Sequence, residues 1–72
     1  MGTYSDMIAD YERQLADVVE RLEALRRARD AMLDENVWDK NTYETIRRIR
    51  NYESVRWDLE HAIHRMRQYE RK

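Results

Sequence analysis

An apolar stripe near the start of the chain constrains the fold more than any other feature. Between residues 4 and 25, apolar side chains recur in alternating steps of four and three. The members of this stripe are Tyr4, Ile8, Tyr11, Leu15, Val18, Leu22 and Leu25. Such heptad spacing is typical of an α-helix that packs along another helix. The sequence therefore predicts a long helix whose apolar seam is covered by a helical partner.

A second stripe with the same spacing lies in the second half of the chain. Its members are Tyr52, Val55, Leu59, Ala62, Met66 and Tyr69. In an antiparallel hairpin, the numbers of facing residues sum to a constant, and a constant of 77 pairs six positions of the two stripes, Leu22 with Val55 among them. The midpoint of these pairs lies between residues 38 and 39. The second stripe is therefore expected to cover the first within one chain.

Capping residues set the expected helix boundaries. Thr3 and Asp6 have the spacing of a capping box, in which each side chain satisfies a free backbone N–H at the start of a helix. The apolar period lapses at residues 36–41, and there Asn41 with Glu44 offers a second N-cap and capping-box partner. A turn is therefore expected midway along the chain.

These signals predict a single all-α domain over residues 1–72. The first helix is expected at about residues 4–35, the turn at about 36–41 and the second helix at about 42–70. The chain has no proline and one glycine, at position 2, so nothing else interrupts helix formation. The predicted fold is an antiparallel two-helix hairpin of the coiled-coil kind.

The second helix carries a further apolar face away from its seam. At about 100° per residue, Ile46 and Trp57 share one side of the helix with Tyr43 and His64. A two-helix hairpin of this size leaves apolar surface in water and is marginally stable alone. We therefore expect a homodimer that forms an antiparallel four-helix bundle, with a monomeric hairpin as the alternative. The bundle is expected to bury the Trp57 face together with Met7, Val19 and Ile63.

Little in the chain could support catalysis. There is no cysteine, serine occurs only at positions 5 and 54, and no glycine-rich loop is present. Asp58 and His61 have a spacing at which two ligands on one helix can share a metal, but the first helix contains no histidine. His61 and His64 are therefore expected to be solvated or packed on aromatic rings. We expect no catalytic, cofactor or metal site.

Six arginines are expected to meet at the turn end of the folded hairpin. They are Arg26, Arg27, Arg29, Arg47, Arg48 and Arg50. Arginine beside aromatic rings can hold phosphates and stack bases, which makes binding of nucleic acid or another polyanion one option. Carboxylates near the same end favour internal pairing instead. An acidic protein partner is the third option.

Trp38 lies at the tip of the expected turn and has two interpretations. Its ring either closes the open end of the hairpin onto Leu33 or Ile46, or anchors a protein interface. The candidate residues for binding a protein partner are Trp38, Tyr43, Ile46, Trp57 and His64.

The charge pattern argues against binding of nucleic acid or membrane by the chain as a whole. The net charge is −1, with −4 on residues 1–36 and +3 on residues 37–72, and the signs alternate along each half. No apolar run approaches the roughly 18 residues of a membrane span, and the N-terminus lacks the features of a secretory signal. With no cysteine to form disulfides, we expect a cytoplasmic protein without a membrane partner.

Arginine outnumbers lysine by twelve to two, which is typical of a GC-rich coding sequence. In this respect and in its short two-helix pattern, the chain resembles the small orphan proteins of actinobacterial phages and prophages. The resemblance rests on general character and implies a small regulatory, defence or counter-defence protein that acts by binding. We therefore expect a non-enzymatic module that binds a protein partner through its helix faces. The alternative is a nucleic-acid-binding regulator that uses the arginine cluster.

Overall fold

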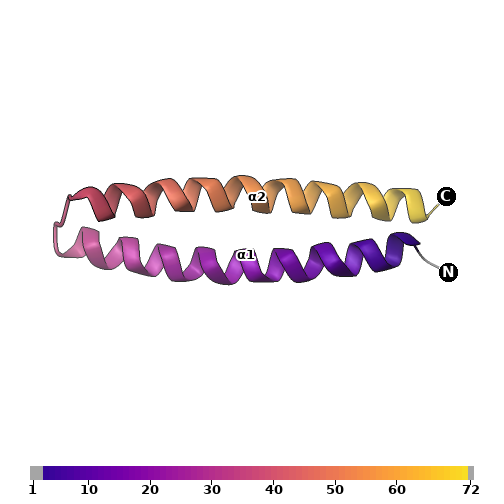
Figure 1. Cartoon of the computed structure of the whole chain (residues 1–72), viewed down its shortest axis with the longest axis horizontal. Helices are drawn as coiled ribbons and strands as arrows, with labels where there is room; N and C mark the ends of the chain where they lie inside the picture. Colours follow the sequence, from indigo (N-terminus) through magenta and orange to yellow (C-terminus); the bar gives the residue numbers. More distant parts are fainter. Residues whose placement is uncertain (1–2, 72) are drawn as a thin grey trace.

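The computed structural model of the chain is an antiparallel pair of long helices (Figure 1). Helix α1 spans Thr3–Asp34 and helix α2 spans Lys40–Glu70. The helices lie side by side over their whole length, and the molecule measures 53 × 15 × 14 Å. The structure describes residues 3–71, with side chains from Tyr4 onward, so the Thr3 side chain of the predicted capping box with Asp6 lies outside the described side chains. The predicted all-α hairpin is confirmed.

The apolar stripe predicted for the first helix forms the α1 side of the interface. Its buried members are Ile8, Val18 and Leu22, and its half-buried members are Tyr11, Leu15 and Leu25. Leu22 is only 1% exposed and lies at the centre of the core. The same spacing continues through Arg29 and Met32, which are also half-buried. The seam of α1 therefore continues for one more heptad, from Leu25 to Met32, than the apolar stripe predicted.

The seam of α2 differs from the prediction at alternate positions. The buried and half-buried seam residues are Thr42, Thr45, Ile49, Tyr52, Arg56, Leu59, Ile63 and Met66. Val55 and Tyr69, which the sequence pattern assigned to the seam, are instead 43% and 58% exposed. Ile63, expected to remain available to a second copy, is buried inside the hairpin. The predicted pairing of Leu22 with Val55 is therefore wrong.

The difference arises because polar side chains occupy three seam positions of α2. Thr42 and Thr45 are both buried, and the long aliphatic part of the half-buried Arg56 can cover apolar surface while its guanidinium reaches water. A search for apolar residues passes over such positions. The predicted seam therefore contains Val55 at the position where the observed seam contains its neighbour Arg56.

Contacts across the seam agree with the predicted antiparallel register. The cross-helix pairs are Glu12 with Arg67 at 3.2 Å, Arg21 with Tyr52 at 3.3 Å, and Arg26 with Glu53 at 3.5 Å. The residue numbers in each pair sum to within four of the predicted constant of 77. The register is therefore close to the prediction although the detailed α2 seam is not.

The end of α1 contains no glycine and uses Asn36 in its place. Asn36 has φ = 57°, in the left-handed region that asparagine tolerates better than most residues. Its N–H donates to the Leu33 carbonyl at 3.0 Å, and the Val37 N–H donates to the Met32 carbonyl at 2.8 Å. These two bonds form a Schellman motif, which satisfies carbonyls at the end of α1.

Asp39, and not Asn41, caps the start of α2. The Asp39 side chain accepts a hydrogen bond from the Thr42 N–H at 3.1 Å, and Thr42 Oγ1 accepts one from the Asp39 N–H at 3.4 Å. The Thr42 hydroxyl also donates to the Val37 carbonyl at 2.8 Å. Because Asp39 and Thr42 form the capping box, the predicted cap at Asn41 with Glu44 is wrong. α2 consequently begins two residues earlier than expected.

Candidate functional site

Antiparallel packing gives the hairpin two long edges, one on each side of the seam. On one edge, Arg67 pairs with Glu12 and Arg26 pairs with Glu53 across the helices. We call this side the ion-pair edge. On the other edge a pocket opens between the helices beside Leu25, Tyr52 and Val55. We call that side the groove edge.

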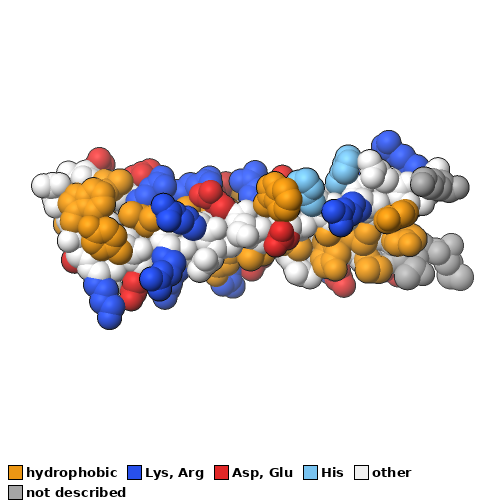
Figure 2. Space-filling model, turned by 90° about the horizontal axis from the view of Figure 1, so that it is seen from above, with side chains coloured by type: hydrophobic (Ala, Val, Ile, Leu, Met, Phe, Trp, Pro, Cys, Tyr) orange, Lys and Arg blue, Asp and Glu red, His pale blue; other side chains and the backbone are white. Residues whose placement is uncertain are grey.

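Aromatic side chains gather at the turn. The rings of Trp38 and Tyr43 lie 6.0 Å apart at 46°, and they are 54% and 61% exposed. Trp38 Nε1 donates to Asn36 Oδ1 at 3.2 Å, which holds the indole beside the turn. Ile46, half-buried, lies one helical turn after Tyr43. We call Trp38, Tyr43 and Ile46 the turn-end patch, and Figure 2 shows hydrophobic side chains gathered at this end of the molecule.

Trp57 lies on the outer surface of α2 and is 60% exposed. Its ring packs on that of His61, with centroids 3.8 Å apart. The i, i+4 spacing of these two residues indicates this contact, but sequence reasoning associated Trp57 with His64. His64 Nε2 instead lies 3.1 Å from the side-chain amide nitrogen of Gln68, within hydrogen-bonding distance.

The five candidate residues for protein binding therefore do not form one continuous surface. Tyr43, Trp57 and His64 share a face of α2 because multiples of seven residues separate them. Trp57 nevertheless lies about 21 Å along the helix from Tyr43, at roughly 1.5 Å per residue. Arg50, on the same face, lies between them. Trp38, Tyr43 and Ile46 are the members that the fold brings together.

The six arginines of the turn half lie on different sides of the hairpin. Arg26 pairs with Glu53, and Arg29 pairs with Asp30 at 3.3 Å. Arg48 lines the pocket of the groove edge, whereas Arg47 lies in a shallow pocket beside Tyr43. Within residues 3–71, four of the six have no carboxylate partner within 4.0 Å, namely Arg27, Arg47, Arg48 and Arg50. These arginines supply positive charge around the turn half but no single basic surface.

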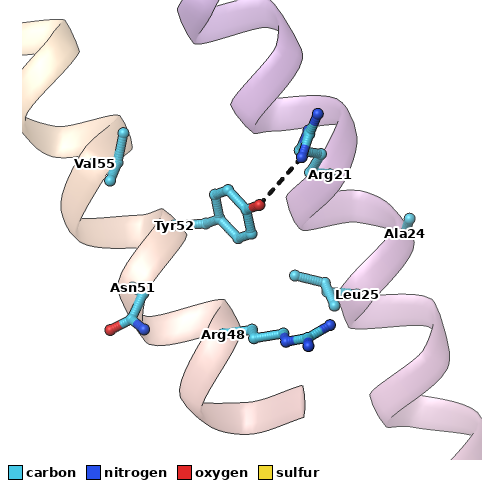
Figure 3. A pocket seen from close by; sticks show the side chains of 7 residues that line it. All are labelled: Arg21, Ala24, Leu25, Arg48, Asn51, Tyr52 and Val55. Carbon is cyan, nitrogen blue, oxygen red and sulfur yellow. Dashed lines mark hydrogen bonds between the residues drawn. The ribbon is translucent and has the colours of Figure 1, made fainter. Parts of the chain in front are cut away.

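Sequence reasoning missed the pocket of the groove edge. The pocket has a volume of about 540 Å³, and both helices contribute apolar side chains to its wall (Figure 3). Arg21 Nη1 donates to the Tyr52 hydroxyl at 3.3 Å across the interface. This hydrogen bond, together with the Asp17 carboxylate, raises the pKa of Arg21 above its usual value.

The pocket was missed because Val55 was assigned to the seam. Because the pattern placed Val55 in the core, it was not considered as part of a surface pocket. The signal that could have found the pocket is the polar interruption at Arg56. Placing Arg56 in the seam moves Val55 to the groove edge.

No group of three or more His, Cys, Asp or Glu side chains in residues 3–71 is arranged to hold a metal ion. Neither of the described helices has an apolar stretch of the length needed to cross a lipid bilayer. Comparisons of the chain with known protein families, curated proteins and solved structures find no match. The structure defines the chain as an all-α helical hairpin.

Proposed function

We propose that this hairpin is a non-enzymatic module that binds another protein through the turn-end patch. The supporting observation is that Trp38 and Tyr43 pack on each other while more than half of each side chain remains in water. Exposed Trp and Tyr side chains held in place by neighbours are typical anchors of protein interfaces. The resemblance to phage and prophage proteins adds regulation or defence as the setting for this binding.

The charges around the turn-end patch favour a partner with acidic side chains. Lys40 and Arg47 flank Tyr43, and Glu44 is the one carboxylate in the same shallow pocket. Lys40 and Arg47 beside the exposed Tyr43 ring complement an apolar surface bordered by Asp and Glu. These two basic side chains contribute to the association rate and the specificity, whereas the aromatic rings contribute most of the affinity.

The hairpin is also proposed to self-associate into a dimer. Its core is one seam wide, and within residues 3–71 seven apolar side chains are buried. Several large apolar side chains remain exposed on the groove edge, including Val55, Met7 and Tyr69. A small domain of this kind gains stability when a second copy covers such surface.

The turn-end patch is tested by capture of partners from the lysate of the native host, treated with nuclease. Trp38→Ala with Tyr43→Ala is expected to remove the protein that the unaltered chain captures. Trp57→Ala is the matched control, because Trp57 is equally exposed but lies on another part of α2. The circular dichroism of all three chains should be the same. Capture that survives the double substitution but is lost with Trp57→Ala would contradict the proposal.

A second candidate function is binding of nucleic acid by the arginines of the turn half. The observation that favours it is the lack of carboxylate partners for Arg47, Arg48 and Arg50 among the described residues. Binding to duplex DNA with a steep dependence on salt would support it, since each neutralised phosphate releases counterions. Reversal of these three charges would then abolish binding, while Trp38→Ala with Tyr43→Ala would leave most of it. An absence of retention on heparin at low salt would eliminate this candidate.

A further inference from the structure

We propose that two copies of the chain pack groove edge to groove edge, antiparallel, about a two-fold axis at Ala62. This inference rests on the self-association proposed above and specifies its interface. It also replaces the interface expected from sequence, because Ile63 is buried within the hairpin and Trp57 lies away from the groove edge.

The first of two apolar areas on the groove edge is the pocket in the middle of the hairpin. Val55 is exposed there, and Leu25 and Tyr52 form half-buried walls (Figure 3). Ala24 leaves room at the rim because its side chain is a single methyl group. The pocket volume of about 540 Å³ is enough to receive side chains from a second molecule.

The second apolar area lies at the open end of the hairpin. The rings of Tyr4 and Tyr69 stack with their centroids 6.2 Å apart at 24°, and both side chains are exposed. Met7 is also exposed, one helical turn after Tyr4 on α1. In the heptad pattern Met7, Val55 and Tyr69 occupy equivalent flanking positions on the same side of the seam. Both apolar areas therefore lie on the groove edge.

The spacing of these areas matches a two-fold axis. Val55 and Tyr69 lie seven residues on either side of Ala62, or about 10 Å at roughly 1.5 Å per residue. A two-fold axis across the hairpin at Ala62 therefore places Tyr69 of each copy against Val55 of the other. Ala62 itself is half-buried and small, so the two α2 helices can approach closely at the axis. One symmetric contact thus covers the open-end area and the Val55 side of the pocket on both copies.

Charges between the two areas are complementary in this antiparallel arrangement. Asp58 and Arg65 lie four residues before and three residues after Ala62. Both are exposed, and neither has an ion-pair partner within residues 3–71. The two-fold axis brings Arg65 of each copy to Asp58 of the other, which forms two symmetric pairs. A parallel arrangement would place Asp58 near Asp17 and Arg65 near Asp10 of the second copy, which gives one like-charge and one opposite-charge contact.

The α1 helices also meet in the antiparallel dimer, about Gln14. This brings Asp10 of one copy toward Asp17 of the other. Each carboxylate already has an arginine on its own helix, Arg13 for Asp10 and Arg21 for Asp17. Their charges are thus balanced before the copies meet, and the spacing of the apolar areas about Ala62 determines the orientation.

Cysteine cross-linking tests the position of the axis, because the natural chain contains no cysteine. Ala62→Cys is expected to form a disulfide-linked dimer rapidly under mild oxidation at about 50 µM, since the two sulfurs meet at the axis. Ala16→Cys is the matched control, an exposed position on α1 away from the groove edge. It is expected to remain mostly monomeric in a denaturing gel, with unchanged helicity for both chains by circular dichroism.

A charge exchange tests the orientation without relying on disulfide chemistry. Arg65→Glu alone and Asp58→Arg alone are each expected to weaken dimerisation about threefold to tenfold in sedimentation, because each creates two like-charge contacts. The double variant is expected to recover most of the original affinity. Such recovery distinguishes a contact between copies from a loss of helix stability.

The outcomes distinguish failure of the Ala62 interface from failure of self-association as a whole. A dimeric mass with equally slow cross-linking of Ala62→Cys and Ala16→Cys would overturn the Ala62 interface and leave self-association in place. A double charge variant weaker than both single variants would also overturn it. A monomeric mass up to about 100 µM would eliminate self-association altogether, and binding at the turn-end patch would be unaffected by that result.

Discussion

Thr42 links the turn to the start of α2. Its side chain is fully buried, and its hydroxyl donates to the Val37 carbonyl while accepting from the Asp39 N–H. These contacts hold together the end of the Schellman motif and the cap of the next helix. A single threonine therefore stabilises this turn, which contains neither the glycine nor the proline that are common in other turns.

Replacing Thr42 should destabilise the hairpin more than replacing the other buried threonine. Thr42→Val keeps the shape of the side chain but leaves a carbonyl and an N–H without their partner, with an expected loss of about 1–3 kcal/mol in the free energy of unfolding. Thr45 donates only to the Asn41 carbonyl of its own helix, at 2.8 Å. Thr45→Val is therefore expected to cost less than about 1 kcal/mol. Urea unfolding of both variants at one low protein concentration measures the difference, and equal losses would contradict this role of Thr42.

The helices differ in how readily their seams can be read from sequence. The α1 seam is apolar from Ile8 to Leu25, so its period predicted the buried residues correctly. The α2 seam includes Arg56 and two threonines. A pattern of apolar residues cannot show that the aliphatic part of an arginine side chain, or the methyl group of a threonine, packs in a core. The correct period was present, in steps of three and four from residue 42, but polar residues concealed it.

The same limit applies to the caps and the candidate site. Asp39 and Asn41 are both good N-cap residues, and only the hydrogen bonds of the folded turn distinguish them. The turn-end patch was predictable because the turn is local and its aromatic residues are few. The groove edge was not, since its position depends on which residues of α2 enter the seam. The antiparallel register was predictable because it depends on the average of many pairs.

A pair of isoleucines on α2 tests the observed seam. Ile63→Ala is expected to cost about 2–4 kcal/mol, because it opens a cavity in the core beside Ile8 and Met66. Ile46→Ala makes the same chemical change at a half-buried position on the ion-pair edge. It is expected to cost no more than half as much. Denaturant midpoints of the two variants decide the matter, and an equal loss would show that Ile63 is not in the core.

At the scale of the whole molecule, the two proposed surfaces are compatible. A two-fold axis at Ala62 lies nearer the open end than the turn, so a second copy covers α2 only from about residue 53 onward. The remaining 13 or so residues of α2, roughly 20 Å of helix, extend beyond the second copy. The turn-end patch lies in this extension. The dimer would therefore present one turn-end patch at each end of a longer rod, free for a different partner.

This division of surfaces makes two copies of the module bivalent. A partner that is itself oligomeric would gain affinity from both ends of the rod, without any new contact at either end. Disruption of the groove edge would then weaken capture of such a partner even though the turn-end patch is intact. Variants of Ala62 and Arg65 are therefore expected to weaken capture by preventing dimerisation, and not by altering the residues that contact the partner.

The central claim is that self-association and partner binding use different surfaces, and Trp38 can report on it directly. In a chain with Trp57→Phe, Trp38 is the sole indole, so its fluorescence emission reports the environment of the turn-end patch. As the protein concentration rises from about 1 to 100 µM and the mass doubles, the emission should remain that of a water-exposed indole. A blue shift that follows the change in mass would place the turn-end patch inside the dimer and contradict the claim.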